Sequence, residues 1–151
     1  MLYSLHAIAL ALIFALSPAM PVDRAEELAD GFTAATEDVD ELLGLTVTAW
    51  HEGQFRLDVQ TCRVRGDGGR ALTLFQLHRH WRGGFSDRDV CATLSLQAQL
   101  ALRALRSCRG SGTSRRAFAR YTGRRLQDAE VSRRVATLAR LRRLVEGYGG
   151  R

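Results

Sequence analysis

The sequence predicts a mostly α-helical protein with a single domain. Its 151 residues suit one domain built around one hydrophobic core. One apolar stripe at helical spacing lies near the C-terminus: Val131, Val135, Leu138, Leu141 and Val145. Capping residues precede the expected helices, as where Asp38 is followed three positions later by Glu41. Periodicity and caps together therefore give the fold class.

The expected helices follow one another with Gly- and Arg-rich loops between them. In chain order they are placed at 23–36, 38–53, 72–80, 94–106, 114–121 and from 128 onward. Asp23, Ser114 and Asp128 are the expected caps of the first, fifth and last of these helices. Residues 56–69 contain the run RGDGG and predict a loop or a short irregular β excursion, and residues 147–151 predict a frayed tail.

The N-terminal segment has the pattern of a signal peptide. Residues 5–16 are apolar apart from His6, a run too short for a membrane span of about 20 residues. Ser17 and Ala19 form a small-x-small cleavage pattern, so we expect cleavage after Ala19 and export to the periplasm or the extracellular space. The first six residues lack Arg and Lys, and the alternative interpretation is a buried N-terminal helix.

The charge balance is basic. All 22 basic residues are Arg, against 16 acidic residues, which gives a formal net charge of +6. Such a surface suits a polyanionic partner: nucleic acid, an anionic membrane or the bacterial cell wall. Nucleotide bias toward Arg codons explains the missing Lys equally well, so composition alone does not choose the partner.

Three cysteines, Cys62, Cys91 and Cys108, leave one without a partner inside the chain. Cys91 and Cys108 flank a helical segment that would hold them roughly 20 Å apart, too far for a disulfide. Pairing of Cys62 with either of the other two remains open. No His or Cys spacing resembles a zinc site, and neither a metal nor a cofactor is expected.

Glu52 is the candidate acid. It lies at the end of the second expected helix, where the partial negative charge of the helix terminus disfavours a carboxylate. Trp50 and Phe55 could desolvate it further, and both effects raise a carboxyl pKa. A glycosidase general acid needs that property in order to protonate a leaving oxygen. The alternative is a solvated glutamate at a helix end.

Three segments in order resemble the motifs of the lytic transglycosylase and goose-type lysozyme superfamily. Residues 52–55 (EGQF) resemble the E-S-x-F motif that carries the catalytic Glu, with Gly53 in place of Ser. Residues 70–76 (RALTLFQ) resemble G-A-x-G-L-M-Q, with Arg70 and Thr73 in place of its glycines. Residues 120–123 (RYTG) cover A-Y-N-A-G in part and lack its Asn. The resemblance extends from about residue 38 to residue 145.

The resemblance implies a lysozyme-like domain over residues 20–146 that cleaves the β-1,4 bond between N-acetylmuramic acid and N-acetylglucosamine. Glu52 would be the acid/base, Gln76 would bind sugar, and Tyr121 would orient the acid or the substrate. Gln76 could instead be a polar helix residue, and Tyr121 a core tyrosine. Trp50, Phe75, Trp81 and Phe85 are candidates to line a saccharide groove, although half of them are expected in the core.

The two nearby carboxylates, Asp58 and Asp67, have explanations in ion pairing and turn chemistry. A single Glu favours a lytic transglycosylase, in which the acetamido group of the substrate assists and its 6-hydroxyl closes on the anomeric carbon. The alternatives are a hydrolytic lysozyme, a non-catalytic peptidoglycan-binding module and a basic helical nucleic-acid binder. The expected partner is the peptidoglycan glycan strand, bound by a monomer without nucleic acid or a membrane span.

Overall fold

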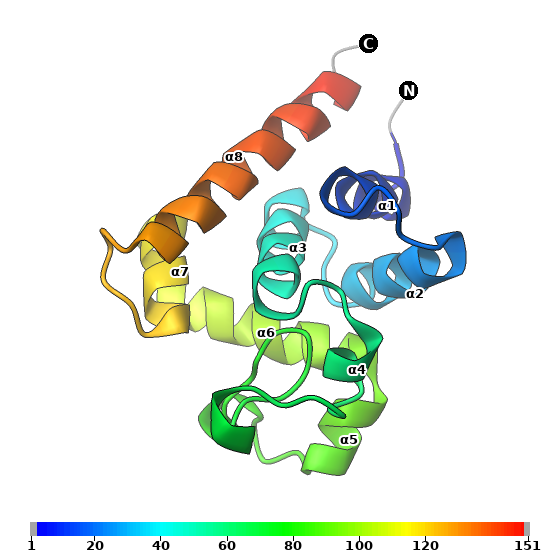
Figure 1. The fold of residues 1–151 in the computed structure, drawn as a ribbon. Coiled ribbons are helices and arrows are strands. Elements are labelled where there is room, and N and C mark those ends of the chain that lie inside the picture. The colour runs from blue at the N-terminus through cyan, green and yellow to red at the C-terminus, as the bar shows by residue number, and fades with distance from the viewer. Residues whose placement is uncertain (1–2, 150–151) are drawn as a thin grey trace.

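The computed structural model describes residues 3–149 and confirms a mostly α-helical single domain. Figure 1 shows the order of its elements. The α-helices are α1 (Leu5–Leu16), α2 (Val22–Thr33), α3 (Val39–Gly53), α4 (Leu57–Gln60), α5 (Asp87–Ala92), α6 (Leu94–Arg109), α7 (Ser114–Thr122) and α8 (Ala129–Gly149). Two short 3₁₀ helices, η1 (Asp67–Gly69) and η2 (Arg79–Trp81), lie in the long connection between α4 and α5.

Helix α3 occupies the centre of the molecule. It contacts α1, α2, α6 and α8, and Figure 1 shows these four helices arranged around it. Leu42, Leu45 and Val47 on this helix are fully buried. Thr46 and Thr48 are buried too, and each hydroxyl donates a hydrogen bond of 2.8 Å to the carbonyl four residues earlier. The helix can therefore be enclosed on most sides without leaving these polar groups unsatisfied.

The expected limits of α3 and the cap of α8 are confirmed. The Asp38 side chain accepts a hydrogen bond of 2.9 Å from the Glu41 amide. The helix ends at Gly53 because Gln54 adopts a left-handed backbone conformation, with φ 50°. At α8 the Asp128 side chain accepts a hydrogen bond of 2.8 Å from the Glu130 amide. Local capping chemistry thus fixes the start and end of the helix that carries Glu52.

Two other expected caps are wrong by one or two residues. Helix α2 begins at Val22 after Pro21, so Asp23 lies in its first turn rather than at its cap. The cap of α7 is Thr113, one residue before the expected Ser114. The short helix α5 was not predicted. The prediction of a frayed tail at residues 147–151 is wrong for residues 147–149, because α8 continues through them. Residues 150 and 151 lie outside the described part of the chain.

The helix predicted at residues 72–80 is wrong. This segment is a tight antiparallel turn in which Leu72 pairs with Leu77, and a second bridge joins Gly66 and Ala71. Thr73 and Gln76 have positive φ angles of 73° and 48°, which interrupt a right-handed helix. The four apolar side chains nevertheless are all fully buried: Leu72, Leu74, Phe75 and Leu77. The apolar pattern therefore reflects burial of a loop. The loop or β excursion expected at residues 56–69 is wrong at residues 57–60, which form α4, whereas irregular chain with the short helix η1 and the two bridges follows from residue 61.

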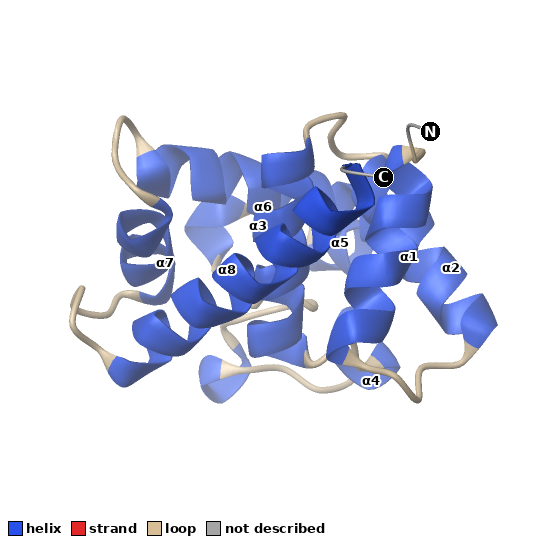
Figure 2. Ribbon diagram, turned by 90° about the horizontal axis from the view of Figure 1, so that it is seen from above, coloured by secondary structure: helices blue, strands red, loops and turns tan. Residues whose placement is uncertain are grey.

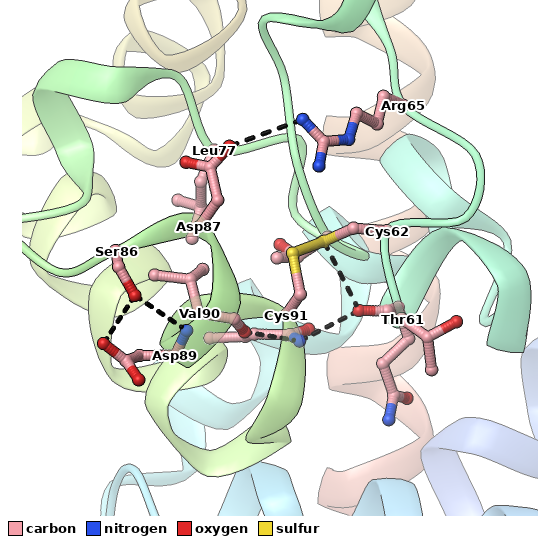
Figure 3. The surroundings of a disulfide bond; sticks show 12 residues. Thr61, Cys62, Arg65, Leu77, Ser86, Asp87, Asp89, Val90 and Cys91 are labelled. Carbon is pink, nitrogen blue, oxygen red and sulfur yellow. Dashed lines mark hydrogen bonds and ion pairs between the residues drawn. A yellow bond between two sulfur atoms is a disulfide. The ribbon is translucent and has the colours of Figure 1, made fainter.

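Cys62 and Cys91 form the disulfide, with their Cα atoms 5.6 Å apart. Figure 3 shows the bond joining the segment after α4 to α5, near an ion pair of 3.4 Å between Arg65 and Asp87. Cys108 is a buried free thiol on α6. The pairing that the sequence left open is thereby decided, and the disulfide closes the connection of which η1, the 72–77 turn and η2 are part.

The N-terminal segment forms α1 and packs into the core. Ala9, Leu12 and Ile13 are fully buried, and the helix contacts α2, α3 and α8. Figure 2 shows α1 beside α2, and the ring centroids of Tyr3 and Tyr148 lie 5.3 Å apart. This packing agrees with the second interpretation of the segment, a buried N-terminal helix, while cleavage after Ala19 and export stay predictions. Among residues 3–149, no helix combines the length and apolar character needed to cross a membrane.

Leu12→Ala tests whether α1 belongs to the cooperative core. The substitution removes a fully buried side chain, so the free energy of unfolding of the full chain should fall by about 2–5 kcal/mol in urea titrations. The control is Val22→Ala, at a side chain that is 66% exposed, which should change stability by less than about 0.5 kcal/mol. Equal effects of the two substitutions would show that α1 unfolds independently.

Reduction of the Cys62–Cys91 disulfide should destabilise the domain. The bond joins residues 29 positions apart, and closing a loop of this length stabilises a fold by about 3–4 kcal/mol in the chain-entropy model. The double substitution Cys62→Ser and Cys91→Ser should therefore lower the melting temperature in non-reducing buffer. Cys108→Ala is the control, because its melting temperature should still fall when reductant is added. A double variant as stable as the parent chain would contradict this expectation.

Candidate active site

Glu52, Gln76 and Tyr121 line one cleft of about 340 Å³. They come from the end of α3, the 72–77 turn and α7. The other lining residues lie on α3, α7 and α8 and in the adjoining loops: His51 on α3, Thr122 on α7, Glu130 and Arg134 on α8, and His78 and Arg124 in loops. The three residues singled out from separate motifs are thus brought together, with a set of charged neighbours that the sequence did not indicate.

Gly53 lets the 72–77 turn approach the end of α3. A Cβ atom at this position would lie 2.9 Å from both Cα and the carbonyl oxygen of Leu74. Backbone atoms cannot move aside as a flexible side chain can, so the serine of the E-S-x-F motif at this position would require the turn to shift. The departure from the motif at Gly53 therefore accompanies a close contact that places Gln76 beside Glu52.

The carboxyl group of Glu52 is largely withdrawn from solvent, its side chain being 18% exposed. Burial raises the pKa of Glu52, because it penalises the charged form, and the negative charge of Glu130 acts in the same direction. The positive charges of Arg134 and Arg124 oppose this shift without cancelling it. The pKa of Glu52 therefore lies above its ordinary value, in the direction expected from the sequence, with burial as the main cause.

Arg134 lies between two carboxylates. Its side chain is only 4% exposed, with Nη1 2.9 Å from Oε1 of Glu52 and Nε 3.2 Å from Oε1 of Glu130. The Nε contact is a hydrogen bond. Nη1 meets Glu52 within ion-pair distance but outside hydrogen-bond geometry, and it has no other partner. The guanidinium thus connects α3 to α8 through charge.

Glu130 is held by further contacts. Arg133 approaches it at 2.7 Å, and Nδ1 of His51 lies 3.3 Å from its Oε1. Burial acts to raise the pKa of Glu130, but the Arg133 hydrogen bond and the charges of Arg134 and His51 outweigh it, so that pKa is lowered. Burial and the charge of Arg134 lower the pKa of His51. Glu130 and Glu52 therefore depart from the ordinary glutamate pKa in opposite directions.

Tyr121 connects α7 to the 72–77 turn through a hydrogen bond. Its hydroxyl donates a hydrogen bond of 2.6 Å to the carbonyl oxygen of Phe75. Burial and the nearby charge of Glu52 raise the pKa of Tyr121 well above its usual value, so the hydroxyl keeps its proton. Tyr121 also packs against the core. Tyr121 is thus a core tyrosine that also lines the cleft, and its role in orienting the acid or the substrate stays a prediction.

The amide of Gln76 is held within its own turn. Its Nε2 donates a hydrogen bond of 3.0 Å to the carbonyl of Thr73. Its Oε1 lies against Gly66, where an added Cβ would come within 1.8 Å of that oxygen. Gln76 is therefore a turn residue at the cleft and not a polar helix residue.

The aromatic candidates differ in how far their rings are buried and in what they pack against. Phe75 is fully buried, with its ring centroid 5.8 Å from that of Phe32, so the expectation that it binds sugar in the groove is wrong. Trp81 is half-buried against the core, 4.7 Å from the ring of His80, and is not part of the cleft wall. Trp50 packs on Phe55 at 5.4 Å. None of these rings supplies a stacking face in the cleft.

The second carboxylate at the cleft is Glu130, which sequence reasoning missed. Asp58 pairs with Arg56 at 2.6 Å and Asp67 with Arg70 at 3.2 Å, and neither lines the cleft. The missed signal was the spacing of Glu130 and Arg134, four positions apart on one helix, which places oppositely charged side chains together. Within residues 3–149, no group of three or more His, Cys, Asp or Glu side chains is arranged to hold a metal ion.

Tyr121→Phe should weaken the junction between α7 and the turn. The substitution removes the hydroxyl but keeps the ring, and it leaves the Phe75 carbonyl without this donor. We expect the free energy of unfolding in urea to fall by about 1–3 kcal/mol. Tyr148→Phe is the control, because no hydrogen bond of the Tyr148 hydroxyl is found within residues 3–149, and it should leave stability unchanged. A Tyr121→Phe chain as stable as this control would contradict the expectation.

Comparison of the chain with protein-family models, with curated proteins and with solved structures finds no match. A proposal about function therefore depends on the motif resemblance and on the chemistry of the cleft.

Proposed function

We propose that this protein cleaves the β-1,4 bond between N-acetylmuramic acid and N-acetylglucosamine in peptidoglycan, with Glu52 as its acid/base. The main support for this proposal is that Glu52, Gln76 and Tyr121 line the same cleft. These residues come from three separated segments, each of which resembles a motif of the same superfamily. A match of motifs without shared function would not require their side chains to line a common cleft.

The raised pKa of Glu52 supports the role of acid. Its raised pKa favours the protonated form, which can donate a proton to the glycosidic oxygen as the bond to the anomeric carbon breaks. The resulting carboxylate can then accept a proton from the attacking oxygen. In a lytic transglycosylase that oxygen is the 6-hydroxyl of the same sugar, and in a lysozyme it belongs to water. One carboxyl group serves both steps.

Gln76 and Tyr121 would act on the substrate rather than on the reacting bond. The Gln76 amide lies at the cleft in a fixed turn, where it can hydrogen-bond to a sugar hydroxyl or acetamido group. The Tyr121 hydroxyl donates its hydrogen bond to the Phe75 carbonyl oxygen, so its own oxygen remains available to the substrate only as an acceptor. We also propose that the enzyme meets this substrate outside the cytoplasm, where peptidoglycan lies.

Glu52→Gln should reduce the release of soluble muropeptides from purified cell wall by at least about 100-fold, the scale of a lost general acid. The amide cannot donate the required proton, although the side chain keeps its size and the fold should persist in circular dichroism. The matched control is Glu146→Gln, at an exposed glutamate on α8, which should retain full activity.

Product masses separate the alternative reactions. Anhydro sugar ends would identify the lytic transglycosylase that we favour, and reducing ends would identify a hydrolytic lysozyme. Wall binding without release by the unaltered chain would favour a non-catalytic module. Equal muropeptide release by Glu52→Gln and Glu146→Gln would overturn the assignment of Glu52.

A further inference from the structure

Arg134 and Glu52 form a buried ion pair in which a second carboxylate also holds the guanidinium. Arg134 is almost completely buried, yet one of its terminal nitrogens makes no hydrogen bond and faces Glu52 Oε1 at 2.9 Å. The other side of the guanidinium is anchored, since Nε donates a hydrogen bond to Glu130 four residues earlier on α8. The Nε hydrogen bond to Glu130 fixes the position of the guanidinium, and its Nη1 places the positive charge beside Glu52.

We propose that Arg134 is a positioning residue that stabilises the Glu52 carboxylate left after Glu52 has given its proton to the leaving sugar oxygen. This inference rests on the proposed function, and it adds a residue that the motif resemblance does not include. Burial alone would make the acid easy to protonate but its carboxylate costly to form. A fixed positive charge at 2.9 Å lowers that cost.

The proton balance defines when Arg134 acts. The Glu52 proton passes to the glycosidic oxygen as the bond between that oxygen and the anomeric carbon breaks, and the released sugar leaves with a free hydroxyl. Glu52 is then an anion beside Arg134. As the attacking hydroxyl bonds to the anomeric carbon, its proton passes to Glu52, which returns to the starting state. No oxidant, reductant or further reactant is needed.

Charged and titratable groups from every neighbouring element line the cleft with Glu52. They are His51 on α3, His78 after the 72–77 turn, Tyr121 on α7, Arg124 before α8, and Glu130 and Arg134 on α8. Glu130 and Arg134 have opposite signs and therefore opposite expected effects. Removal of Arg134 should make Glu52 easier to protonate, whereas removal of the Glu130 charge should make it harder.

Arg134→Met tests the first effect, because methionine fills similar space without charge. In protein labelled with ¹³C-glutamate, the titration midpoint of the Glu52 carboxyl should move to higher pH by about one unit or more. The signal is assigned by its loss in Glu52→Gln. The fall of kcat/KM for wall cleavage at alkaline pH should move the same way, and kcat should drop about tenfold. Arg134→Lys, which restores a positive charge, should recover part of kcat.

Glu130→Gln provides the second test and keeps the inference falsifiable where Arg134→Met does not fold. Loss of a negative charge beside Arg134 should move the Glu52 midpoint and the alkaline fall of kcat/KM to lower pH. The control is Arg142→Met on the same helix, because Arg142 pairs with Asp40 away from the cleft and should leave both measurements unchanged.

A Glu52 titration midpoint that moves to higher pH in Arg134→Met and to lower pH in Glu130→Gln supports the inference. A merely structural role of Arg134 would not shift the midpoint in opposite directions. An unmoved Glu52 midpoint in a folded Arg134→Met chain, or an upward shift in Glu130→Gln, overturns it. The NMR titration does not need activity. If the parent chain cleaves no wall while the two midpoints shift as expected, the proposed function fails and the charge coupling of Arg134 to Glu52 stands.

Discussion

The close approach of Gly53 to the backbone of Leu74 is the constraint on which the cleft depends. Glu52 is the penultimate residue of a helix that other helices enclose, so the helix cannot shift to meet the loop. The loop must come to the helix, and a Cβ at residue 53 would meet its backbone at 2.9 Å. Burial of Leu74 and Phe75 then fixes the turn, and Gln76 follows directly at the cleft.

The packing of other helices around α3 also determines the electrostatics of Glu52. A carboxyl group near the middle of a helical domain is poorly solvated, and burial is the largest influence on the pKa of Glu52. A buried guanidinium is costly too, and it persists only with carboxylates arranged around it. Arg134 has two of them, one from α3 and one from its own helix. Each charge is tolerable because the others are present, so loss of any one should perturb the pKa values of those that remain.

The sequence predicted the ends of the elements better than their assembly. Capping at Asp38 and Asp128 is local chemistry, and the structure confirms it. The false helix at residues 72–80 came from apolar residues whose burial arises from the neighbouring helices, while positive φ angles at Thr73 and Gln76 break the helical path. No local pattern distinguishes Arg134 from the other arginines, because its burial depends on contacts between α3 and α8.

The role of Glu130 bears on which reaction the cleft can support. A hydrolase of the two-carboxylate kind needs a second group free to act as nucleophile or base. Glu130 lines the cleft, but Arg133 and Arg134 both donate hydrogen bonds to it and His51 lies 3.3 Å away. Its oxygens are occupied by groups that stabilise its charge and lower its basicity. It is therefore better suited to holding Arg134 than to attacking a sugar or activating water. Among the described residues that line the cleft, Glu52 is then the carboxyl group with a raised pKa, which favours the proposed reaction in which the substrate supplies its own nucleophile.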